Sequence, residues 1–254
     1  MKVSIIIPTF NSEEFLKSAI DSVLSQTYPD IECIVVDGGS KDGTIKILES
    51  YGNKISFISE KDKGVFDALN KGIRKAQGEI IGWLGADDFY ANQTVIDTAV
   101  KNIEKTNALL CWGDLVYVDR HDTNKVLRYW KSSAYEKGLM KKAWQLPHFA
   151  SFIRKEVFET YGYFRLDFKI SADYEFFLRV LEKNNIASSY VPNLFLKMRA
   201  GGISNQSIKN IIKGNKDCYK AWKVNGLRIN PLTLFLRKPF LKIWQYWRKP
   251  TIEV

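Results

Sequence analysis

Residues 2–37 read KVSIIIPTFNSEEFLKSAIDSVLSQTYPDIECIVVD, and this stretch decides the fold class. Its two ends, KVSIIIP and IECIVVD, are short β-branched runs with little polar alternation, which is typical of strands covered on both faces of a parallel sheet. The segment between them, SEEFLKSAIDSVLSQ, has apolar residues at helical spacing and two glutamates where a first turn would be. The stretch therefore predicts a strand, a helix with Asn11 or Ser12 as its N-cap, and a second parallel strand.

The alternation of strand-like and helix-like runs continues through about residue 90. GTIKILESY and VFDALNKGIRKA have helical periodicity, whereas ISFISE and EIIGWLGA have the pattern of strands. This order predicts a Rossmann-like α/β half. The rest of the chain is less regular, and it predicts strands at ALLCWGDLVYV and KVLRYWK and helices at RKEVFETYG and ADYEFFLRVLEKN.

Composition and charge bound the class of protein. With 254 residues, 45% of them hydrophobic, the chain can form one large domain or one domain with a small appendage. Its formal net charge of +10 favours a polyanion, an anionic substrate or an anionic membrane surface, without choosing among them. Cys33, Cys111 and Cys218 are odd in number and far apart, so we expect neither a disulfide framework nor a zinc site, and a reducing compartment fits. No apolar run reaches the length of a signal-peptide core or a membrane span, which predicts a cytoplasmic protein.

Polar clusters follow each of the first four predicted strands. They are PTFN at residues 8–11, DGGSKDGT at 37–44, EKDKG at 60–64 and GADD at 85–88. Any one of them has an ordinary turn composition. In an open parallel sheet, however, the carboxyl ends of the strands share one edge, and ligands bind there. Four such loops therefore indicate a binding site, while the absence of GxGxxG and of GKS or GKT disfavours dinucleotide binding and a P-loop.

Three ordered blocks carry a resemblance to a known family. They are VSIIIPTFNSEEFLKSAIDSVLSQTYPDIECIVVDGGSKDGT, EKDKGVFDALNKGIRKAQGEIIGWLGADD and GYFRLDFKISADYEFFLRV. Over roughly residues 1 to 200 the chain resembles the family 2 glycosyltransferases, inverting enzymes of the GT-A fold. The resemblance implies an α/β protein with a Rossmann-like nucleotide-binding half and a mixed central sheet. It divides the chain into a GT-A domain at 1–205, with a nucleotide-sugar-binding half at 1–90 and an acceptor-side half at 91–205, and a C-terminal extension at 206–254.

The resemblance also implies a uridine diphosphate donor and places its pocket. Asp37 resembles the residue that hydrogen-bonds the nucleotide base, and Gly38 follows it in the donor-binding set. The residues that would wall the uracil and ribose pocket are Pro8, Thr9, Phe10 and Asn11. In the third loop, Gly64 would let the backbone approach the donor, Lys63 would screen phosphate charge and Asp67 would touch the sugar. Lys63 could equally be a solvated charge, and Asp67 a first-turn helix carboxylate.

Asp87 and Asp88 resemble the DXD-type motif that binds a divalent metal on the donor's diphosphate, although the motif here reads Ala86, Asp87, Asp88. Asp88 is our first choice as the direct ligand. Adjacent carboxylates after a buried strand suit Mg²⁺ or Mn²⁺, which are hard cations that use oxygen ligands. The alternative is that Asp88 caps the helix predicted at NQTVIDTAVKNI or only turns the chain.

An inverting transferase needs one carboxylate that takes the proton from the attacking hydroxyl. Asp173 is the candidate, in ISADYEFFLRVLEKN, where ADY stands in place of the family's common ED pair. Ala172 replaces the first carboxylate of that pair, and Glu175, on a different helix face, is the reserve choice. The alternative for Asp173 is helix capping. His148, expected just before an apolar helix start, would lie near the acceptor or be an ordinary buried histidine.

The C-terminal segment PLTLFLRKPFLKIWQYWRKP lies beyond the resemblance. At helical spacing it places on one face Leu236, Phe240, Ile243, Trp244 and Trp247. Its lysines and arginines fall largely off that face. This pattern predicts a basic amphipathic helix at an anionic membrane surface. The alternative is a helix docked on the protein's own sheet or on a second subunit.

Together these patterns predict a metal-dependent inverting glycosyltransferase. It would move a sugar from a UDP-sugar to a hydroxyl of a glycan or lipid-linked acceptor, in cell-surface polysaccharide biosynthesis at the inner face of the cell membrane. A nucleic-acid-binding protein is a rival on charge and aromatic content, but no binding motif is recognisable. A nucleotidyltransferase is another rival, and it is disfavoured because PTFN stands where its glycine-rich opening loop would be. We therefore expect no nucleic acid among the partners.

Overall fold

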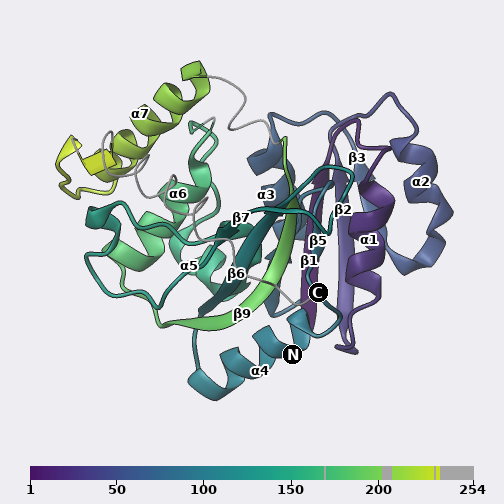
Figure 1. The fold of residues 1–254 in the computed structure, drawn as a ribbon, viewed down its shortest axis with the longest axis horizontal. Helices are drawn as coiled ribbons and strands as arrows, with labels where there is room; N and C mark the ends of the chain where they lie inside the picture. The colour runs from purple at the N-terminus through teal and green to yellow at the C-terminus, as the bar shows by residue number, and fades with distance from the viewer. Residues whose placement is uncertain (169, 202–207, 232, 235–254) are drawn as a thin grey trace.

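The computed structural model describes residues 1–168, 170–201, 208–231 and 233–234, and Figure 1 shows their arrangement. Within these residues, nine strands form one mixed sheet in the order β3-β2-β1-β4-β8-β6-β9-β5, with β7 paired to β6. The strands are β1 (Val3–Thr9), β2 (Ile31–Asp37), β3 (Ser56–Ser59), β4 (Ile80–Trp83), β5 (Phe89–Tyr90), β6 (Leu110–Val118), β7 (Val126–Trp130), β8 (Ser151–Arg154) and β9 (Ser188–Arg199). The α-helices are α1 (Leu16–Leu24), α2 (Thr44–Ser50), α3 (Val65–Lys75), α4 (Val95–Thr106), α5 (Glu156–Tyr161), α6 (Ala172–Phe177) and α7 (Ile208–Val224). The mixed α/β architecture predicted from the sequence is confirmed.

The part of the sheet formed by β1 to β4 is parallel. β1 pairs in parallel with β2 and with β4, and β2 pairs in parallel with β3. Their carboxyl ends therefore lie at one edge, as the sequence predicted for the four polar loops. The register aligns Thr9 with Asp37 and Asp37 with Ser59, so three polar side chains form a row across the ends of β1, β2 and β3.

Antiparallel strands extend the sheet beyond β4. β8 runs antiparallel to β4, with Gly82 opposite Phe152, and β6 runs antiparallel to β8. The beginning of β8 consequently lies at the carboxyl end of β4. The second half of the chain thus delivers its own residues to the edge where the first four strands end.

Helices cover both faces of the sheet. Successive side chains of a strand point to opposite faces, so neighbouring residues of one strand pack against different helices. Ile5 and Ile7 pack in a core with α1 and α4, whereas Ile6 packs in a second core with α3, α5 and α6. All seven residues of β1 are buried, which explains its apolar run without alternation. Figure 1 shows α6 and α7 at the end of the molecule opposite to α1 and α2.

The start of the first helix differs from its prediction. α1 begins later than expected, so neither Asn11 nor Ser12 is its N-cap. These two residues bind the loop after β2 instead. Asn11 Oδ1 accepts the N–H of Lys41, and the N–H of Ser12 donates to Thr44 Oγ1, each at 2.9 Å. The first two polar loops are therefore joined to one another, and the helix starts only beyond this junction.

The helix start expected after His148 is also wrong. His148 begins a short 3₁₀ turn, His148–Ala150, which leads into β8. β8 is paired on both sides, with β4 and with β6, and so forms a central strand. The physical reason is that an apolar run as short as SFIR has no periodicity that separates a buried strand from a helix.

α7 is the described helix of the C-terminal extension. It packs on α6, where Trp222 is fully buried and its Nε1 donates to Tyr174 Oη at 2.8 Å. The amphipathic helix predicted from about Pro239 to Arg248, with its membrane contact, lies outside the described residues. The domain boundary at residue 205 stays a prediction. In the part of the chain that the structure describes, no helix combines the length and the apolar character that a membrane span needs.

Candidate active site

The row of polar side chains at the ends of β1 to β3 is held by hydrogen bonds from the chain itself. Asp37 is fully buried. Its Oδ2 accepts hydrogen bonds from the backbone N–H groups of Gly39 and Ser40, at 3.0 Å each. Ser59 Oγ also donates to Oδ2, at 2.7 Å, and Ser40 Oγ donates to Oδ1. A carboxylate offers about four acceptor positions, so Asp37 is satisfied internally and shapes the loop after β2.

The loop after β1 forms the rim of the same edge. Phe10 is 60% exposed, more than any other large hydrophobic side chain in the described residues. Pro8 and Thr9 are buried, and Thr9 Oγ1 has no hydrogen-bond partner among the residues described. A buried hydroxyl without a partner at the end of a strand is a group that a ligand can satisfy. The predicted pocket residues of β1 are therefore brought together, with an aromatic ring at the surface and a hydroxyl beneath it.

The loop after β3 exposes backbone atoms at the sheet edge, because it contains a glycine. Gly64 has a φ of +114°, in the region that favours glycine, and nothing described lies within 4 Å of the position that a Cβ would take. Asp67 Oδ2 accepts the N–H of Lys63 at 3.0 Å, so Asp67 takes the first-turn role that was its alternative. Lys63 itself is exposed. Contacts of these three residues with a donor stay predictions.

The two carboxylates at the end of β4 differ in their surroundings. Asp87 is half-buried, whereas Asp88 is 3% exposed and its Oδ1 accepts the backbone N–H of Arg199 at 3.0 Å. Burial raises the pKa of Asp88 well above its usual range, and the neighbouring Asp87 charge raises it further. Gly85 leaves room for this side chain, because a Cβ there would lie 2.5 Å from Asp88 Oδ2. Asp88 does not cap α4, whose N-cap is Thr94 and from which β5 separates it.

These two carboxylates fit a divalent cation. Their oxygens are hard donors, and burial and the Asp87 charge raise the pKa of Asp88 in spite of the opposing Arg199 charge. A cation at Asp88 Oδ2 would add positive charge there. Within the described residues no group of three or more His, Cys, Asp or Glu side chains could hold a metal. Two carboxylates would therefore leave the remaining positions to oxygens of the bound ligand and to water.

Arg199, at the end of β9, is a residue that the sequence analysis missed. Its guanidinium lies 4.6 Å from the ring centroid of Phe15 and 4.7 Å from that of Phe89. Nη1 donates to the backbone oxygen of Asp87 at 2.6 Å. Burial lowers the pKa of Arg199, and the Asp88 charge opposes this shift. Arg199 thus fixes the acidic turn through backbone groups, and no pattern in the sequence links the two segments.

The acceptor-side half brings another carboxylate to this edge. His148 comes just before β8, whose beginning lies at the carboxyl end of β4. Its Nδ1 is 3.1 Å from Oδ2 of Asp173, which lies in the first turn of α6 and makes no capping hydrogen bond. Burial lowers the pKa of His148, and the Asp173 charge opposes this shift. Burial therefore favours the neutral imidazole, whose Nδ1 lies beside the Asp173 carboxylate.

A pocket adjoins the His148–Asp173 pair. Its lining residues are Trp130, Met140, Gln145, Leu146, His148, Asp173, Tyr174 and Phe177. Aromatic and aliphatic side chains form much of its wall, and the pair supplies polar atoms at one side. Such a site suits a ligand group with an apolar or ring-shaped body and a hydroxyl that reaches the carboxylate.

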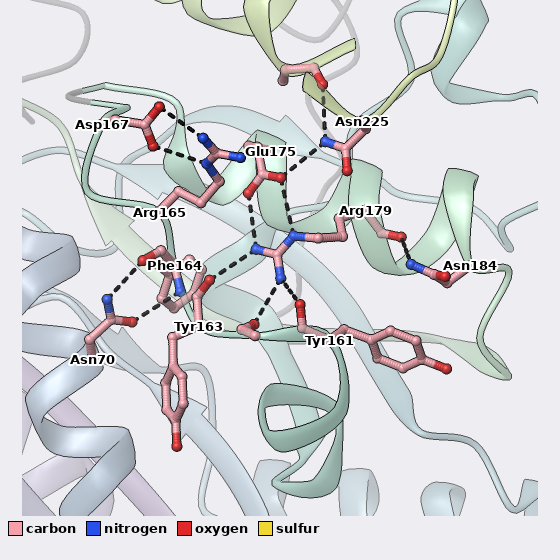
Figure 2. Close-up of polar contacts among 12 residues, drawn as sticks. Asn70, Tyr161, Tyr163, Phe164, Arg165, Asp167, Glu175, Arg179, Asn184 and Asn225 are labelled. Atoms are coloured by element: carbon pink, nitrogen blue, oxygen red, sulfur yellow. Dashed lines mark hydrogen bonds and ion pairs between the residues drawn. The ribbon is translucent and has the colours of Figure 1, made fainter. Parts of the chain in front are cut away.

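Glu175, the reserve choice for the base, belongs to an internal network that Figure 2 shows. It is 1% exposed, and its two oxygens pair with Arg179 at 3.1 and 3.0 Å. Asn225 Nδ2 donates to Oε1 at 3.0 Å. Arg179 also donates to the backbone oxygens of residues 161–163. Glu175 therefore anchors α6 to this loop and has no oxygen available for a substrate.

Asp62, in the loop after β3, is a second residue at this edge that the sequence analysis did not single out. Its Oδ2 lies 2.6 Å from the position that a Cβ of Gly38 would take. The available signal was the pair Gly38 and Gly39 directly after a buried strand. Glycine there removes a side chain from the site and leaves space for a group from another loop.

Comparisons with known proteins identify the family of the chain. A family model described as glycosyl transferase family 2 matches residues 4–162. A PGL/p-HBAD biosynthesis glycosyltransferase of Mycobacterium bovis is 32% identical over 208 residues, which cover 80% of this chain and 78% of the relative. An uncharacterized glycosyltransferase of Rickettsia felis is 31% identical over 230 residues, which cover 87% of this chain. The chain spans 37% of the length of that relative.

Solved structures share the fold. Staphylococcus aureus TarS 1-349 in complex with UDP-GlcNAc matches with a TM-score of 0.66 at 17% identity, covering 95% of this chain and 72% of that one. The mannosyltransferase PcManGT from Pyrobaculum calidifontis, in complex with GDP-Man and Mn2+, matches with a TM-score of 0.66 at 20% identity, covering 94% and 71%. The GT-A fold that the sequence resemblance implied is confirmed.

Proposed function

This chain belongs to glycosyl transferase family 2, and from that membership we propose that it moves a sugar from a UDP-sugar to a hydroxyl of a glycan or lipid-linked acceptor, with inversion. The observation that carries the proposal is one edge of the sheet, where the acidic pair Asp87 and Asp88 follows β4 and the His148–Asp173 pair precedes the neighbouring strand β8. A donor diphosphate needs a cation and an acceptor hydroxyl needs a base. This edge offers a place for each.

Uridine is favoured as the nucleoside of the donor. Solved TarS structures contain UDP and UDP-GlcNAc, whereas the PcManGT structure contains GDP-Man. The fold therefore accommodates more than one base, and the pocket of each chain has to select among them. In this chain the exposed ring of Phe10 and the buried hydroxyl of Thr9 are the groups that a base and a ribose would meet at the end of β1.

Asp173 carries out the proton transfer in the proposed reaction. The acceptor O–H gives its proton to the Asp173 carboxylate while its oxygen forms a bond to the anomeric carbon of the sugar. The bond from that carbon to the diphosphate oxygen breaks, and the electron pair leaves with UDP. His148 Nδ1, 3.1 Å from Oδ2, holds the carboxylate in place and leaves Oδ1 to the hydroxyl.

Asp87 and Asp88 would hold Mg²⁺ or Mn²⁺ on the diphosphate of the donor. A bound cation supplies charge neutralisation of the diphosphate as UDP departs. The chain's own part is to position the two carboxylates. Arg199 fixes their turn through backbone hydrogen bonds, and Gly85 leaves the space in which Asp88 Oδ2 lies. The peripheral membrane location and the surface-polysaccharide pathway stay predictions from the sequence.

A nucleotide-sugar panel tests the proposal. The full chain is incubated with MnCl₂ and UDP-, GDP- and CDP-sugars, and release of the nucleoside diphosphate is measured. We expect a UDP-sugar to be consumed and EDTA to abolish the reaction. Asp88→Asn should lower the rate on the order of 100-fold and stay folded, because the Asn oxygen can still accept the Arg199 N–H.

The control for this variant is Asp97→Asn, an exposed first-turn carboxylate of α4 that pairs with Lys101. It should behave as the wild type. Release of no nucleoside diphosphate from any donor would reject the transferase proposal. Full activity in EDTA would reject only the proposed metal dependence and would leave the transferase proposal standing.

A further inference from the structure

Asp37, which the family resemblance implied as the reader of the base, is buried by the loop after β2. Four donors of its own chain bind its two oxygens, and the side chain is fully buried. A base N–H could reach Asp37 only after this loop moved, because the side chain is 0% exposed, and the loop would then lose contacts that shape it. The acceptor that reads the base therefore has to come from another residue.

Asp62 fills the space that glycine leaves at position 38. The ideal Cβ position of Gly38 lies 2.6 Å from Asp62 Oδ2 and 3.4 Å from Phe10 Cδ2. The loop after β3 thus carries a carboxylate into the place where a side chain of the loop after β2 would stand. Phe10, next to the same point, is 60% exposed. A carboxylate oxygen and an open aromatic ring therefore lie side by side at the carboxyl edge of β1 and β2.

The two oxygens of Asp62 differ: one accepts a hydrogen bond from the chain, and the other is available to a ligand. Oδ1 accepts the N–H of Gly64 at 2.8 Å, which fixes the side chain in the turn before α3. In the described part of the chain, Oδ2 accepts no hydrogen bond. A turn alone needs the first oxygen and not the second. The free oxygen beside an exposed ring is complementary to a flat heterocycle that packs on the ring and offers one N–H.

We propose that Asp62 reads the base of the donor: its Oδ2 accepts the N3–H of uracil while the ring of uracil packs against Phe10. This inference rests on the proposed function, and it names the group that selects uridine. Uracil offers a single N–H between two carbonyl oxygens. Cytosine has an acceptor at N3, which faces Asp62 unfavourably. Guanine has two adjacent donors, N1–H and the amino group, for one free oxygen.

Asp62→Asn separates base reading from the turn. The Asn oxygen can still accept the Gly64 N–H, and the amide nitrogen then stands where Oδ2 was, so that a donor replaces an acceptor. We expect the affinity for UDP to fall by about 10- to 100-fold, as for a lost hydrogen bond to a charged group. The affinity for CDP should rise, because cytosine N3 can accept from the new amide. Calorimetric titration of the full chain with UDP, CDP and GDP in MnCl₂ measures each affinity.

A modified nucleotide tests the same contact from the ligand's side. In 3-methyl-UDP a methyl group replaces the N3 hydrogen, so the wild type should bind it about 10- to 100-fold more weakly than UDP. The Asp62→Asn variant should show a smaller loss between UDP and 3-methyl-UDP, since it no longer accepts from N3. This cycle isolates the contact between Oδ2 and the N3–H.

Gly38→Ala moves the Asp62 carboxylate without removing it. Gly38 has no positive φ, so alanine can adopt its backbone conformation, and its methyl group must displace Oδ2 from 2.6 Å. We expect this variant to weaken UDP binding too. Adding Asp62→Asn to it should change the affinity little, because both substitutions remove the same contact.

Asp122→Asn is the matched control. Asp122 Oδ1 also accepts the N–H of the residue two positions on, Asn124, at 3.2 Å, but in an exposed turn between β6 and β7. It should leave UDP affinity unchanged. Equal binding of UDP and 3-methyl-UDP by the wild type and by Asp62→Asn would overturn the inference and leave the proposed function standing. A wild type that binds none of the nucleotides would overturn both.

Discussion

At the carboxyl ends of β2 and β3, and again on the helix α6, two carboxylates can be compared that have different surroundings. At the sheet edge, Asp37 is saturated by four internal donors, whereas Asp62 keeps one oxygen without a partner in the described chain. On α6, Glu175 is saturated by Arg179 and a second donor, whereas Asp173 faces a pocket.

The two regions differ in how far apart the members of each pair lie along the chain. Asp173 and Glu175 are two residues apart on one helix, so the helical period alone turns them to different sides. Asp37 and Asp62 come from the ends of different strands, and only the sheet brings them together. In both regions the structural carboxylate is buried and has several internal donors, whereas the carboxylate available to a substrate is partly exposed and has fewer donors.

The largest effect is expected from a substitution of Asp173, the carboxylate of α6 that is available to a substrate. Asp173→Asn should lower kcat for transfer by about 1000-fold, because an amide cannot take the proton of the acceptor hydroxyl. The amide keeps the size and shape of the carboxylate beside His148, so the affinity for UDP should change by less than about twofold. Steady-state kinetics with the donor identified in the nucleotide-sugar panel, and calorimetric titration with UDP, measure the two quantities.

Asp97→Asn again serves as the control for this variant, because Asp97 is likewise an acid in the first turn of its helix. It should leave both kcat and UDP affinity unchanged. Near-normal transfer by Asp173→Asn would contradict the assignment of Asp173 as the base. Asp173 and Glu175 would then differ only in their contribution to stability.

A smaller effect is expected from the saturated carboxylate of the same helix. Glu175→Ala should lower the free energy of unfolding by about 3 kcal/mol, because Arg179 keeps a largely buried charge without its carboxylate partner. For a chain of this size the melting temperature should fall by roughly 6–12 °C. Thermal and urea unfolding measure the change.

The control for Glu175 is an ion pair in the same region that Figure 2 also shows. Asp167 pairs with Arg165 at 2.9 Å and with Lys220 at 2.8 Å, but the side chains are 43 to 45% exposed. Asp167→Asn should therefore lower stability by less than about 1 kcal/mol. An equal loss of stability in Glu175→Ala and Asp167→Asn would mean that buried hydrogen-bond donors do not make the Glu175 ion pair more stabilising than an exposed one.

The parts of the fold that one segment decides by itself could be predicted from the sequence. The bounds of β1 and β2 agree with the apolar runs, because helices cover both faces of each strand. The grouping of four polar loops at one edge followed from the parallel order of the strands. The different faces of Asp173 and Glu175 followed from the helical period.

Contacts between distant segments could not be predicted in this way. Arg199 N donates to Asp88 across 111 positions of the chain, and no local pattern announces it. The start of α1 moved because Asn11 and Ser12 bind the neighbouring loop, where local capping preference would have used them in the helix. The saturation of Asp37 depends in part on Ser59 from β3. A carboxylate's role therefore depends on donors that only the folded sheet supplies.

The smallest expected effect concerns His148, the partner of Asp173. Burial lowers the pKa of His148 below its ordinary value of about 6.5, against the opposing charge of Asp173. The unfolded chain then binds the imidazole proton more readily than the folded chain, so stability should fall as the pH falls through about 6.5. His148→Gln should reduce this pH dependence, whereas His121→Gln, at a side chain that is 72% exposed, should leave it unchanged. Urea unfolding at several values between about pH 5.5 and 7.5 measures the slopes.

The opposite dependence of stability on pH would change the comparison between Asp173 and Glu175. If stability rose as the pH fell through about 6.5, His148 would be charged in the folded chain and would form an ion pair with Asp173. Both acids of α6 would be ion-paired, Asp173 with His148 and Glu175 with Arg179. A neutral His148 is therefore what distinguishes the surroundings of Asp173 from those of Glu175, whose partner Arg179 stays charged.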